Sequence, residues 1–316
     1  MEKNYDIICV GMALVDSIIK GFDPTPISAS GYRAVSGSLN VGGEAVNEAI
    51  AAARLGMRTG ILCALGQDAA GGMVEAALAG AGVNTSLIVR SSGHATPVTT
   101  MFVNDDGTRQ SITNLSHRHN FHPEQYGERY MDTRALILGS LFRAPFDDPE
   151  IIFNVLRRAG ETGTLIVADT KLPNFRVLGL DDLAEALPLI DYITPNEDEA
   201  RYYSGKTDPD EMAEVFLDRG IRNVIIKLGK NGCLFRNRSI RLRLPACEID
   251  AVDATGAGDN FVAGFTSELL RGASPEEALR FANACGAICT TAVGAGSALK
   301  SREQVLAFLE AQNRGA

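Results

Sequence analysis

Short hydrophobic runs alternate with longer segments of helical periodicity along most of the chain. Apolar runs typical of strands buried on both faces lie at 7–10, 59–64, 135–138, 165–168, 192–194 and 223–227. Apolar residues recur at helical spacing in segments 44–55, 72–81, 149–159, 210–219, 257–270, 275–291 and 302–311. This alternation predicts an α/β fold of the doubly wound type, with a mostly parallel sheet covered by helices on both faces. We expect a single domain over residues 1–316.

Two extended stretches, at about 12–40 and 95–115, interrupt the alternation. In the second, the strand-like segments 99–103 and 110–113 flank an Asn-Asp-Asp-Gly sequence at 104–107, which predicts a β-hairpin. Extended segments near an active site are candidates for a small β lid, which a phosphoryl-transfer enzyme needs to exclude water. The alternative is that both stretches are insertions without a role in function.

The composition and charge of the chain limit the classes of molecule that it is expected to bind. With 45% hydrophobic residues the chain can bury a substantial core, and its net charge of −9 and pI near 5.1 come without any cluster of Lys or Arg. We therefore expect small-molecule partners rather than nucleic acid or a membrane surface. The chain enters its first strand without a leader and has no run of about 18 apolar residues, so a cytoplasmic location is expected. Its six cysteines lack C-x-x-C spacing and are expected to be reduced thiols.

The segment 253–259, Asp-Ala-Thr-Gly-Ala-Gly-Asp, carries the clearest chemical signal. A glycine-rich turn leads directly into an apolar helix, so the amides of Gly256, Ala257, Gly258 and Asp259 are expected to surround a helix N-terminus. Free N–H groups and the positive end of the helix dipole favour a phosphate there. The motif fits neither a P-loop nor a dinucleotide fingerprint, because no G-x-x-x-x-G-K-[ST] occurs and Phe261 stands where a third glycine would be.

Asp259 is the candidate general base. An ionised aspartate beside a bound phosphate can accept the proton of an attacking hydroxyl while positioned donors stabilise the transferring phosphoryl group. The alternative is that Asp253, Thr255 and Asp259 only cap and charge the start of a helix.

Five motifs in order along nearly the whole chain resemble the ribokinase-like, or PfkB, carbohydrate kinases. Besides 253–259, they are Gly-x-x-Leu-x-Asp ending at Asp16, Gly-Gly at 42–43 followed by Asn47, Gly-x-Asp at 66–68, and Asn-x-x-Glu at 196–199. The resemblance implies an ATP-dependent sugar kinase that transfers the γ-phosphate of MgATP to a hydroxyl, expected to be primary, of a small sugar, sugar acid or polyol.

The resemblance also assigns site residues. Asp16, Gly42, Gly43 and Asn47 are expected to hold sugar hydroxyls. ATP binding is assigned to Asn196, Lys227, Gly229, Gly232 and Asn283, and Glu199 is assigned to Mg²⁺ through water. Some family members bind K⁺ beside the phosphate site, where Asp253 and Thr255 stand in this chain. Asn196 and Glu199 are equally suited to cap the helix after Pro195.

Departures from the family pattern concern the substrate. Glu44 follows the Gly-Gly pair where ribokinases carry Lys, and Leu14 replaces an Asn that helps them hold ribose, so ribose is a weaker expectation. Asp169-Thr170-Lys171 lacks the Asp-x-Asn-x-Arg of many fructokinases and 2-keto-3-deoxygluconate kinases. The basic residues Arg33, Arg143 and Lys171 are candidate contacts for an acidic substrate or for ATP, with plain surface exposure as the alternative.

Further alternatives stay open at this point. A nucleoside kinase of the same fold and a non-catalytic sugar-binding regulator are the rival functions. His117, His119 and His122 form a cluster that we interpret as a solvated loop or a substrate contact, with a metal site as the alternative. The exposed edges of a lid also make a homodimer through the lid an expectation.

Overall fold

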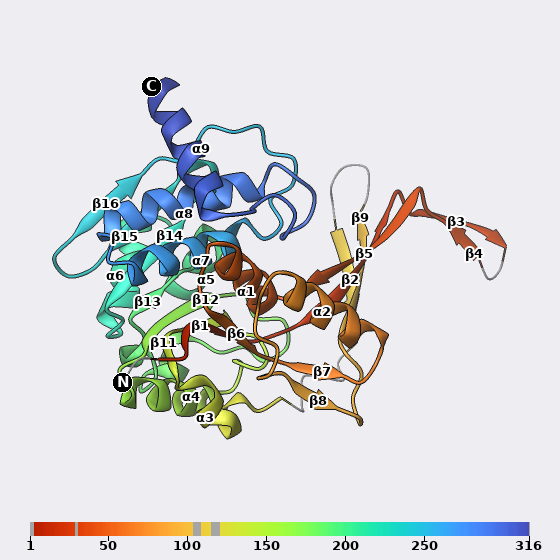
Figure 1. Ribbon diagram of the computed structural model, residues 1–316, viewed down its shortest axis with the longest axis horizontal. Helices are drawn as coiled ribbons and strands as arrows, with labels where there is room; N and C mark the ends of the chain where they lie inside the picture. Colours follow the sequence, from red (N-terminus) through yellow and green to blue (C-terminus); the bar gives the residue numbers. More distant parts are fainter. Residues whose placement is uncertain (1–2, 29–30, 104–108, 115–120, 316) are drawn as a thin grey trace.

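A computed structural model describes residues 3–28, 31–103, 109–114 and 121–315. The centre of the molecule is an eight-stranded sheet in the order β16-β15-β14-β13-β12-β11-β1-β6 (Figure 1). Its strands are β1 (Tyr5–Val10), β6 (Thr59–Leu62), β11 (Thr133–Leu141), β12 (Leu165–Thr170), β13 (Tyr192–Ile193), β14 (Asn223–Lys227), β15 (Cys233–Arg236) and β16 (Arg241–Leu244). Neighbours from β6 to β14 run parallel, and β15 and β16 add an antiparallel edge. The predicted doubly wound α/β fold is confirmed.

Helices cover both faces of this sheet and bury its apolar residues in two large cores. One core joins the sheet to α1 (Glu44–Arg54), α2 (Ala69–Gly80), α7 (Ala257–Leu270) and α8 (Pro275–Cys289). The other joins it to α4 (Pro149–Glu161), α5 (Glu197–Ser204) and α6 (Pro209–Asp218). The short helix α3 (Gly127–Tyr130) lies against α4, and α9 (Arg302–Gly315) lies against α8. Among the described residues, no helix has the length and apolar character required to cross a bilayer.

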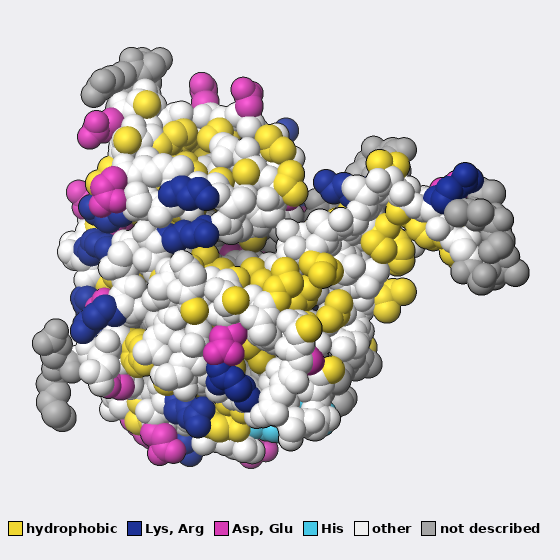
Figure 2. Space-filling view, turned by 45° about the vertical axis from the view of Figure 1, so that its right-hand side comes forward, with side chains coloured by type: hydrophobic (Ala, Val, Ile, Leu, Met, Phe, Trp, Pro, Cys, Tyr) yellow, Lys and Arg dark blue, Asp and Glu magenta, His cyan; other side chains and the backbone are white. Residues whose placement is uncertain are grey.

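A second, four-stranded sheet in the order β10-β9-β2-β5 stands beside the main body. It contains β2 (Leu14–Lys20), β5 (Ser36–Gly42), β9 (Val98–Val103) and β10 (Arg109–Thr113), all from the two stretches that interrupt the α/β pattern. The predicted hairpin is confirmed as the antiparallel pair β9–β10, and its turn at 104–108 lies outside the described residues. Figure 2 shows this small sheet as part of an arm that projects from the body, with hydrophobic side chains on its surface.

Two two-stranded sheets account for the other described strands. β3 (Asp23–Ser28) pairs with β4 (Gly31–Arg33) at the far end of the arm, and β7 (Ala64–Gly66) pairs with β8 (Val89–Ser91) beside α2 (Figure 1). The predicted strand 59–64 is therefore wrong in extent, because the chain leaves the main sheet after Leu62 and begins β7 at Ala64. Short 3-10 helices lie in the described connections, at Pro123–Tyr126, Leu180–Leu183, Leu187–Leu189 and Gly229–Asn231.

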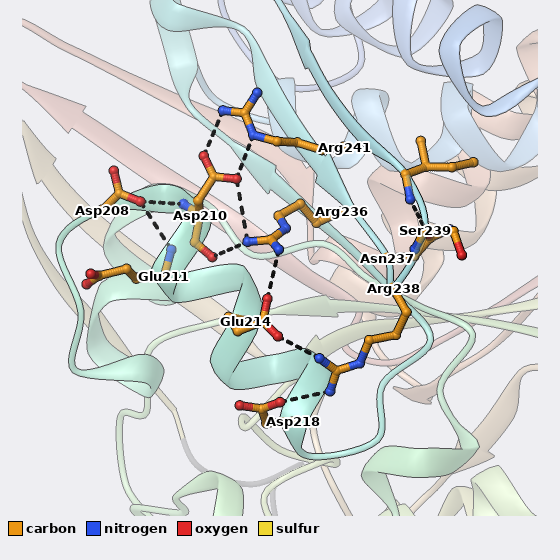
Figure 3. Close-up of polar contacts among 11 residues, drawn as sticks. Asp208, Asp210, Glu211, Glu214, Asp218, Arg236, Asn237, Arg238, Ser239 and Arg241 are labelled. Carbon is orange, nitrogen blue, oxygen red and sulfur yellow. Dashed lines mark hydrogen bonds and ion pairs between the residues drawn. The ribbon is translucent and has the colours of Figure 1, made fainter.

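An ion-pair network fastens α6 to the antiparallel edge of the main sheet (Figure 3). Nε and Nη2 of Arg241 donate to the two carboxylate oxygens of Asp210, each at 2.7 Å. Arg238 bridges Glu214 and Asp218 at 2.6 and 2.8 Å. These side chains are exposed or half-exposed, so solvent screens each pair and its contribution to stability is small. We assign this network to the docking of α6 rather than to catalysis.

Candidate active site

The loop before α7 is shaped by one aspartate and one glycine. Asp253 accepts hydrogen bonds from the Thr255 amide at 3.0 Å, the Thr255 hydroxyl at 2.7 Å and the Gly294 amide at 3.0 Å. Gly256 adopts a left-handed conformation with φ of 77°, and a Cβ there would lie 2.1 Å from that of Ala295. A side chain at 256 is therefore excluded by both conformation and space.

This loop leaves backbone donors at the start of α7, as predicted, with one exception. The N–H groups of Gly256, Gly258 and Asp259 meet no hydrogen-bond acceptor among the described residues. The Ala257 N–H instead donates to the carbonyl oxygen of Ala254 at 3.2 Å. The Ala257 amide thus closes the turn, and its contact with an anion stays a prediction. Three amides at the positive end of a 14-residue helix remain for a phosphate.

Asp259 lies in the first turn of α7 and is only 5% exposed. Its Oδ2 accepts a hydrogen bond of 2.7 Å from Nδ2 of Asn47 on α1. Burial raises the pKa of Asp259 to about 6, with the Lys171 ammonium lowering it and the Glu44 and Asp169 carboxylates raising it further. At neutral pH such a group is mostly ionised and still basic enough to accept a proton, which is the condition a general base needs.

The residues assigned to the sugar lie where β2, β5 and α1 meet. Gly42 pairs with Leu14 at the inner ends of β2 and β5, and a Cβ on Gly42 would lie 2.3 Å from Oδ2 of Asp16. Gly43 caps α1 with φ of 99°, and a Cβ there would meet the Met12 carbonyl oxygen at 2.3 Å. The two glycines therefore make room for the Asp16 carboxylate and for the chain before β2. Burial, aided by the Glu44 carboxylate, raises the pKa of Asp16 to about 6.

Two lysines enter the site from strands β12 and β14. The Lys227 ammonium donates to Oδ1 of Asp169 at 2.5 Å and lies 3.2 Å from where a Cβ on Gly258 would be. The Lys171 ammonium lies 3.5 Å from Oε1 of Glu44. One lysine is thus held beside the loop before α7, and the other faces the start of α1.

The end of β11 and the residues after it carry unusual backbone conformations. Ser140 and Phe142 have φ of 73° and 76°, a region that residues with a side chain adopt at a cost in energy. Next to them, Arg143 donates from Nε to the Leu172 carbonyl oxygen at 2.6 Å. Ser140 and Arg143 both line the same cavity as Asp16 and Asp259. The backbone of this segment is therefore bent where it forms the wall of the site.

Asn196 and Glu199 form a reciprocal cap at the start of α5. The Glu199 amide donates to Oδ1 of Asn196, and the Asn196 amide donates to Oε2 of Glu199, each at 2.9 Å. The same Oε2 accepts from the Thr170 hydroxyl at 2.8 Å. The capping interpretation is confirmed, and it leaves Oε1 of Glu199 for other ligands. A single carboxylate oxygen fits an Mg²⁺ that keeps most of its waters, because Mg²⁺ binds through few protein ligands.

Two cavities meet at this site. One, of about 750 Å³, is lined by Asp16, Asn47, Asp259 and residues of the small sheet. The other, of about 990 Å³, lies between the loop 229–231, the loop 245–251 and helix α8. Both are bounded by Lys227, Gly229, Ala254 and Gly258. The start of α7 therefore separates the two cavities, with Asp259 on the side of the smaller one.

Three of the five residues assigned to ATP, Lys227, Gly229 and Asn283, line the larger cavity, whereas Asn196 lines the smaller one. The Asn283 side chain donates to the Pro245 carbonyl oxygen at 3.1 Å. Gly232 lines neither cavity. Gly232 has φ of 82°, and a Cβ there would lie 1.9 Å from the Leu244 carbonyl oxygen, so this glycine allows the close approach of β15 and β16. Its role in binding ATP stays a prediction from the motif.

Buried carboxyl groups beneath the site were not singled out from the sequence. Glu48 of α1 is fully buried and neither of its oxygens has a hydrogen-bond partner among the described residues. Burial raises its pKa well above the usual range, and the charges of Asp169 and Asp259 raise it further. Oδ2 of Asp169 is likewise buried without a partner within the described part of the chain. The sequence could have indicated Asp169, because it stands at the carboxyl end of a buried strand. No feature of the sequence indicated that Glu48 would be buried.

The other candidates lie elsewhere. Arg33 is exposed on the arm and pairs with Asp23 at 3.4 Å. His117 and His119 lie outside the described residues, and His122 lies 3.3 Å from Glu124 in a half-exposed pair. Within the described residues, no group of three or more His, Cys, Asp or Glu side chains is arranged to hold a metal ion.

Comparison with known proteins agrees with this geometry. The model of the pfkB family of carbohydrate kinases matches residues 6–302. The ribokinase of Haemophilus influenzae is 31% identical over 277 residues, covering 85% of this chain and 87% of the relative. Probable fructokinase-2 of Arabidopsis thaliana is 30% identical over 325 residues, covering 97% and 96%.

A solved structure shares the fold along its whole length. The Arabidopsis thaliana ribokinase complexed with ribose and ATP superposes with a TM-score of 0.85 at 23% identity, covering 98% of this chain and 99% of that one. Together with the family match over most of the chain, the site described above identifies the protein as a member of the PfkB family of carbohydrate kinases and therefore as a phosphotransferase.

Proposed function

We propose that the protein transfers the γ-phosphoryl group of MgATP to a hydroxyl, most simply a primary one, of a small sugar, sugar acid or polyol. The observation that carries the proposal is the position of Asp259. It lies where two cavities meet, beside three backbone amides at a helix N-terminus, and is oriented by Asn47 at 2.7 Å. A base next to an anion site, with room for a nucleotide on one side and an acceptor on the other, is what in-line phosphoryl transfer requires.

In the proposed reaction the acceptor hydroxyl lies between Asp16 and Asp259. Its oxygen forms a bond to the γ-phosphorus while its proton passes to the Asp259 carboxylate, and the bond from that phosphorus to the bridging oxygen of ADP breaks. The amides of Gly256, Gly258 and Asp259 and the ammonium of Lys227 stabilise the negative charge on the phosphate oxygens. Mg²⁺, when bound with the nucleotide near Glu199, supplies further charge neutralisation.

A monovalent cation is a secondary part of the proposal. Asp253, Thr255 and Gly294 lie together beside the loop before α7, which supports a K⁺ site there. The Asp253 carboxylate already accepts three hydrogen bonds, so such a site would draw mainly on backbone carbonyl oxygens.

The identity of the sugar depends on the side chains of the acceptor cavity. The relatives named above are a ribokinase and a probable fructokinase, which differ in their sugar. Here Glu44 and Arg143 line the acceptor cavity together with Asp16 and Leu14. The half-exposed guanidinium of Arg143 supports the inclusion of sugar acids among the candidate acceptors. ADP release measured against pentoses, hexoses, sugar acids, polyols and nucleosides separates these classes and includes the rival nucleoside kinase.

The small sheet is proposed to act as the lid of the acceptor cavity, because Thr99, Met101, Ser111 and Thr113 on β9 and β10 line it. Its two edge strands, β5 and β10, expose Leu39 and Ile112, which are 61% and 69% exposed. A homodimer in which two such sheets cover each other, and a cytoplasmic location, remain predictions from the sequence.

Replacing the base tests the proposal. Asp259→Asn keeps the size of the side chain but removes the proton acceptor, so we expect turnover to fall by roughly 10²–10⁴-fold while calorimetry still detects binding of MgATP and of the best sugar. Asp218→Asn, which alters an exposed ion pair on α6 (Figure 3), serves as the matched control with normal turnover. Turnover of Asp259→Asn within a few-fold of the unmodified enzyme would refute Asp259 as the base.

A further inference from the structure

The lysine that follows β12 is held by its backbone and points into the acceptor cavity. The Lys171 amide donates to the Leu141 carbonyl oxygen at 3.0 Å, and the Tyr203 hydroxyl donates to the Lys171 carbonyl oxygen at 2.6 Å. Its side chain is 27% exposed and lines the cavity that contains Asp259 and Gly258. The backbone N–H and carbonyl groups of Lys171 are thus both held by hydrogen bonds, which sets the direction in which its side chain leaves the backbone.

Four carboxylates on four different elements act on this ammonium. Glu44 on α1 lies 3.5 Å away, and Asp259 on α7, Asp169 on β12 and Glu199 on α5 contribute further attraction. Burial alone disfavours the charged form, but these carboxylates raise the pKa of Lys171 above its usual range. The ammonium therefore stays charged and lies within electrostatic reach of both the proposed base and the carboxylate proposed to face Mg²⁺.

The contact with Glu44 does not use all the donors of Lys171. An ammonium has three N–H donors, and within the described part of the chain Glu44 is the recorded partner of this one, at a distance longer than a good hydrogen bond. Lys227, in contrast, is drawn to Asp169 at 2.5 Å. Lys171 is thus oriented by a loose ion pair and still has donors that face the cavity.

We propose that Lys171 is a further catalytic residue whose ammonium contacts the phosphoryl group during its transfer, and that Glu44 is the positioning residue that holds it there. This inference rests on the proposed kinase function. Lys171, Asp259 and Gly258 line one cavity, and Gly258 also lines the adjoining one. A phosphoryl group that passes from a nucleotide in the second cavity to an acceptor in the first therefore comes near this ammonium. No proton moves to or from Lys171 in this step. Its charge compensates the phosphate oxygens while the new O–P bond forms and the bond to ADP breaks.

The first test is the loss of the ammonium. Lys171→Met is expected to lower kcat by roughly 10²–10³-fold, the range found when one donor to a developing charge is removed, with a much smaller change in the KM of the sugar. Lys171→Arg keeps the charge and is expected to recover a substantial part of kcat. Lys206→Met removes an exposed lysine in the α5–α6 connection and serves as the matched control. Circular dichroism and MgATP binding establish that each variant is folded.

The double variant separates catalysis from simple charge balance. If Lys171 only neutralises Glu44, then removing both charges with Glu44→Gln and Lys171→Met restores kcat to nearly normal. If Lys171 acts on the phosphoryl group, the double variant stays as slow as Lys171→Met, and Glu44→Gln alone lowers kcat less. Restoration in the double variant would overturn the proposal. Glu185→Gln, at an exposed position, is the control for the loss of a carboxylate.

The pH dependence of kcat provides a second test, in which Lys171→Met and Glu44→Gln are expected to shift the profile in opposite directions. The charged groups that face Asp259 are Lys171, Glu44, Asp169 and Glu48, and Asn47 donates to it. Lys171 lowers the pKa of Asp259 and Glu44 raises it. Lys171→Met is therefore expected to move the acidic limb of the profile to higher pH, and Glu44→Gln is expected to move it to lower pH. Limbs that do not move in these directions would show that neither charge lies beside the base.

The two proposals fail in distinguishable ways. If Asp259→Asn is inactive and Lys171→Met turns over normally, the proposed function stands and the role of Lys171 is refuted. If Asp259→Asn is nearly as active as the unmodified enzyme, the proposed base itself is wrong, whatever Lys171→Met shows.

Discussion

The hydrogen bond from Asn47 to Asp259 allows a quantitative prediction. It links α1 to α7 across the site at 2.7 Å, and it favours the ionised form of Asp259 because an amide N–H donates to the carboxylate. Hydrogen bonds to charged groups contribute about 1.5–3 kcal/mol. We take the lower value, since Asn47 is the smallest of the influences on Asp259, and about 1.4 kcal/mol corresponds to one pKa unit. Asn47→Ala is therefore expected to raise the pKa of Asp259 from about 6 to roughly 7.

The sign of the effect on rate follows from the role of the base. Only the ionised carboxylate accepts a proton, so activity is lost as the pH falls through the pKa of Asp259. At pH 6 about half of the Asp259 groups are ionised in the unmodified enzyme and roughly a tenth in Asn47→Ala, which predicts an approximately fivefold lower kcat. At pH 9 both carboxylates are ionised, and this difference is expected to disappear.

The assay is the initial rate of ADP formation at saturating sugar and MgATP from pH 5 to pH 9. Direct separation of ADP by chromatography avoids coupling enzymes with pH dependences of their own. The ratio of the rates of variant and unmodified enzyme at each pH removes the titration of ATP. Asn84→Ala, at an exposed amide away from the site, is the matched control. A ratio that stays constant across the pH range would refute the argument, because it would show that Asn47 does not act through the ionisation of Asp259.

Two further predictions concern groups that the fold buries. Glu48→Gln is expected to raise the melting temperature at pH 8 and to leave it unchanged at pH 4. Because the pKa of Glu48 is raised in the folded state, the folded state loses stability as the pH rises above the ordinary pKa of 4.5, and Gln removes this loss. An equal effect at both pH values, or any effect of the exposed control Glu185→Gln, would contradict this prediction. Gly42→Ala is expected to raise the KM of the sugar by displacing the Asp16 carboxylate, whereas Gly72→Ala, where a Cβ meets nothing within 4 Å, is expected to leave KM unchanged; equal KM values for both variants would show that Asp16 does not hold the sugar.

The fold was predictable because its strands and helices obey local rules. The segment 223–227 and the helix 257–270 have the predicted bounds, since a run of buried β-branched residues and a glycine-rich helix start are both encoded within a few residues. In the small sheet the hairpin β9–β10 was predicted, whereas β2 and β5 were assigned only to an extended stretch. Their pairing, with β2 between β5 and β9, depends on contacts between segments about 20 and 80 residues apart, which periodicity does not encode.

The site was predictable in its motifs and less so in its electrostatics. Asp259 and Asn47 belong to recognisable motifs, but the hydrogen bond between them joins residues 212 positions apart. The same holds for the pairing of Lys171 with Glu44. From the sequence, Glu44 was noted as a departure from the family pattern and Lys171 as a candidate contact for an acidic substrate or ATP. Gly232 and Ala257 were assigned to ligands because of their place in a motif. The structure adds a backbone role for each, a strand contact at Gly232 and a closed turn at Ala257, and periodicity encodes neither.

The charge of the site explains why its base has the pKa that catalysis needs. Asp16, Glu44, Glu48, Asp169, Glu199 and Asp259 converge on the sheet edge, against the cations Arg143, Lys171 and Lys227. An excess of buried carboxyl groups costs stability, and Glu48 avoids part of that cost by keeping its proton. Burial, together with the charges of Glu44 and Asp169, opposes ionisation of Asp259, while Lys171 and Asn47 favour it, and the pKa lies at about 6. A carboxylate with an ordinary pKa would be a weaker base at neutral pH, so the same crowding that destabilises the folded state makes Asp259 a better proton acceptor.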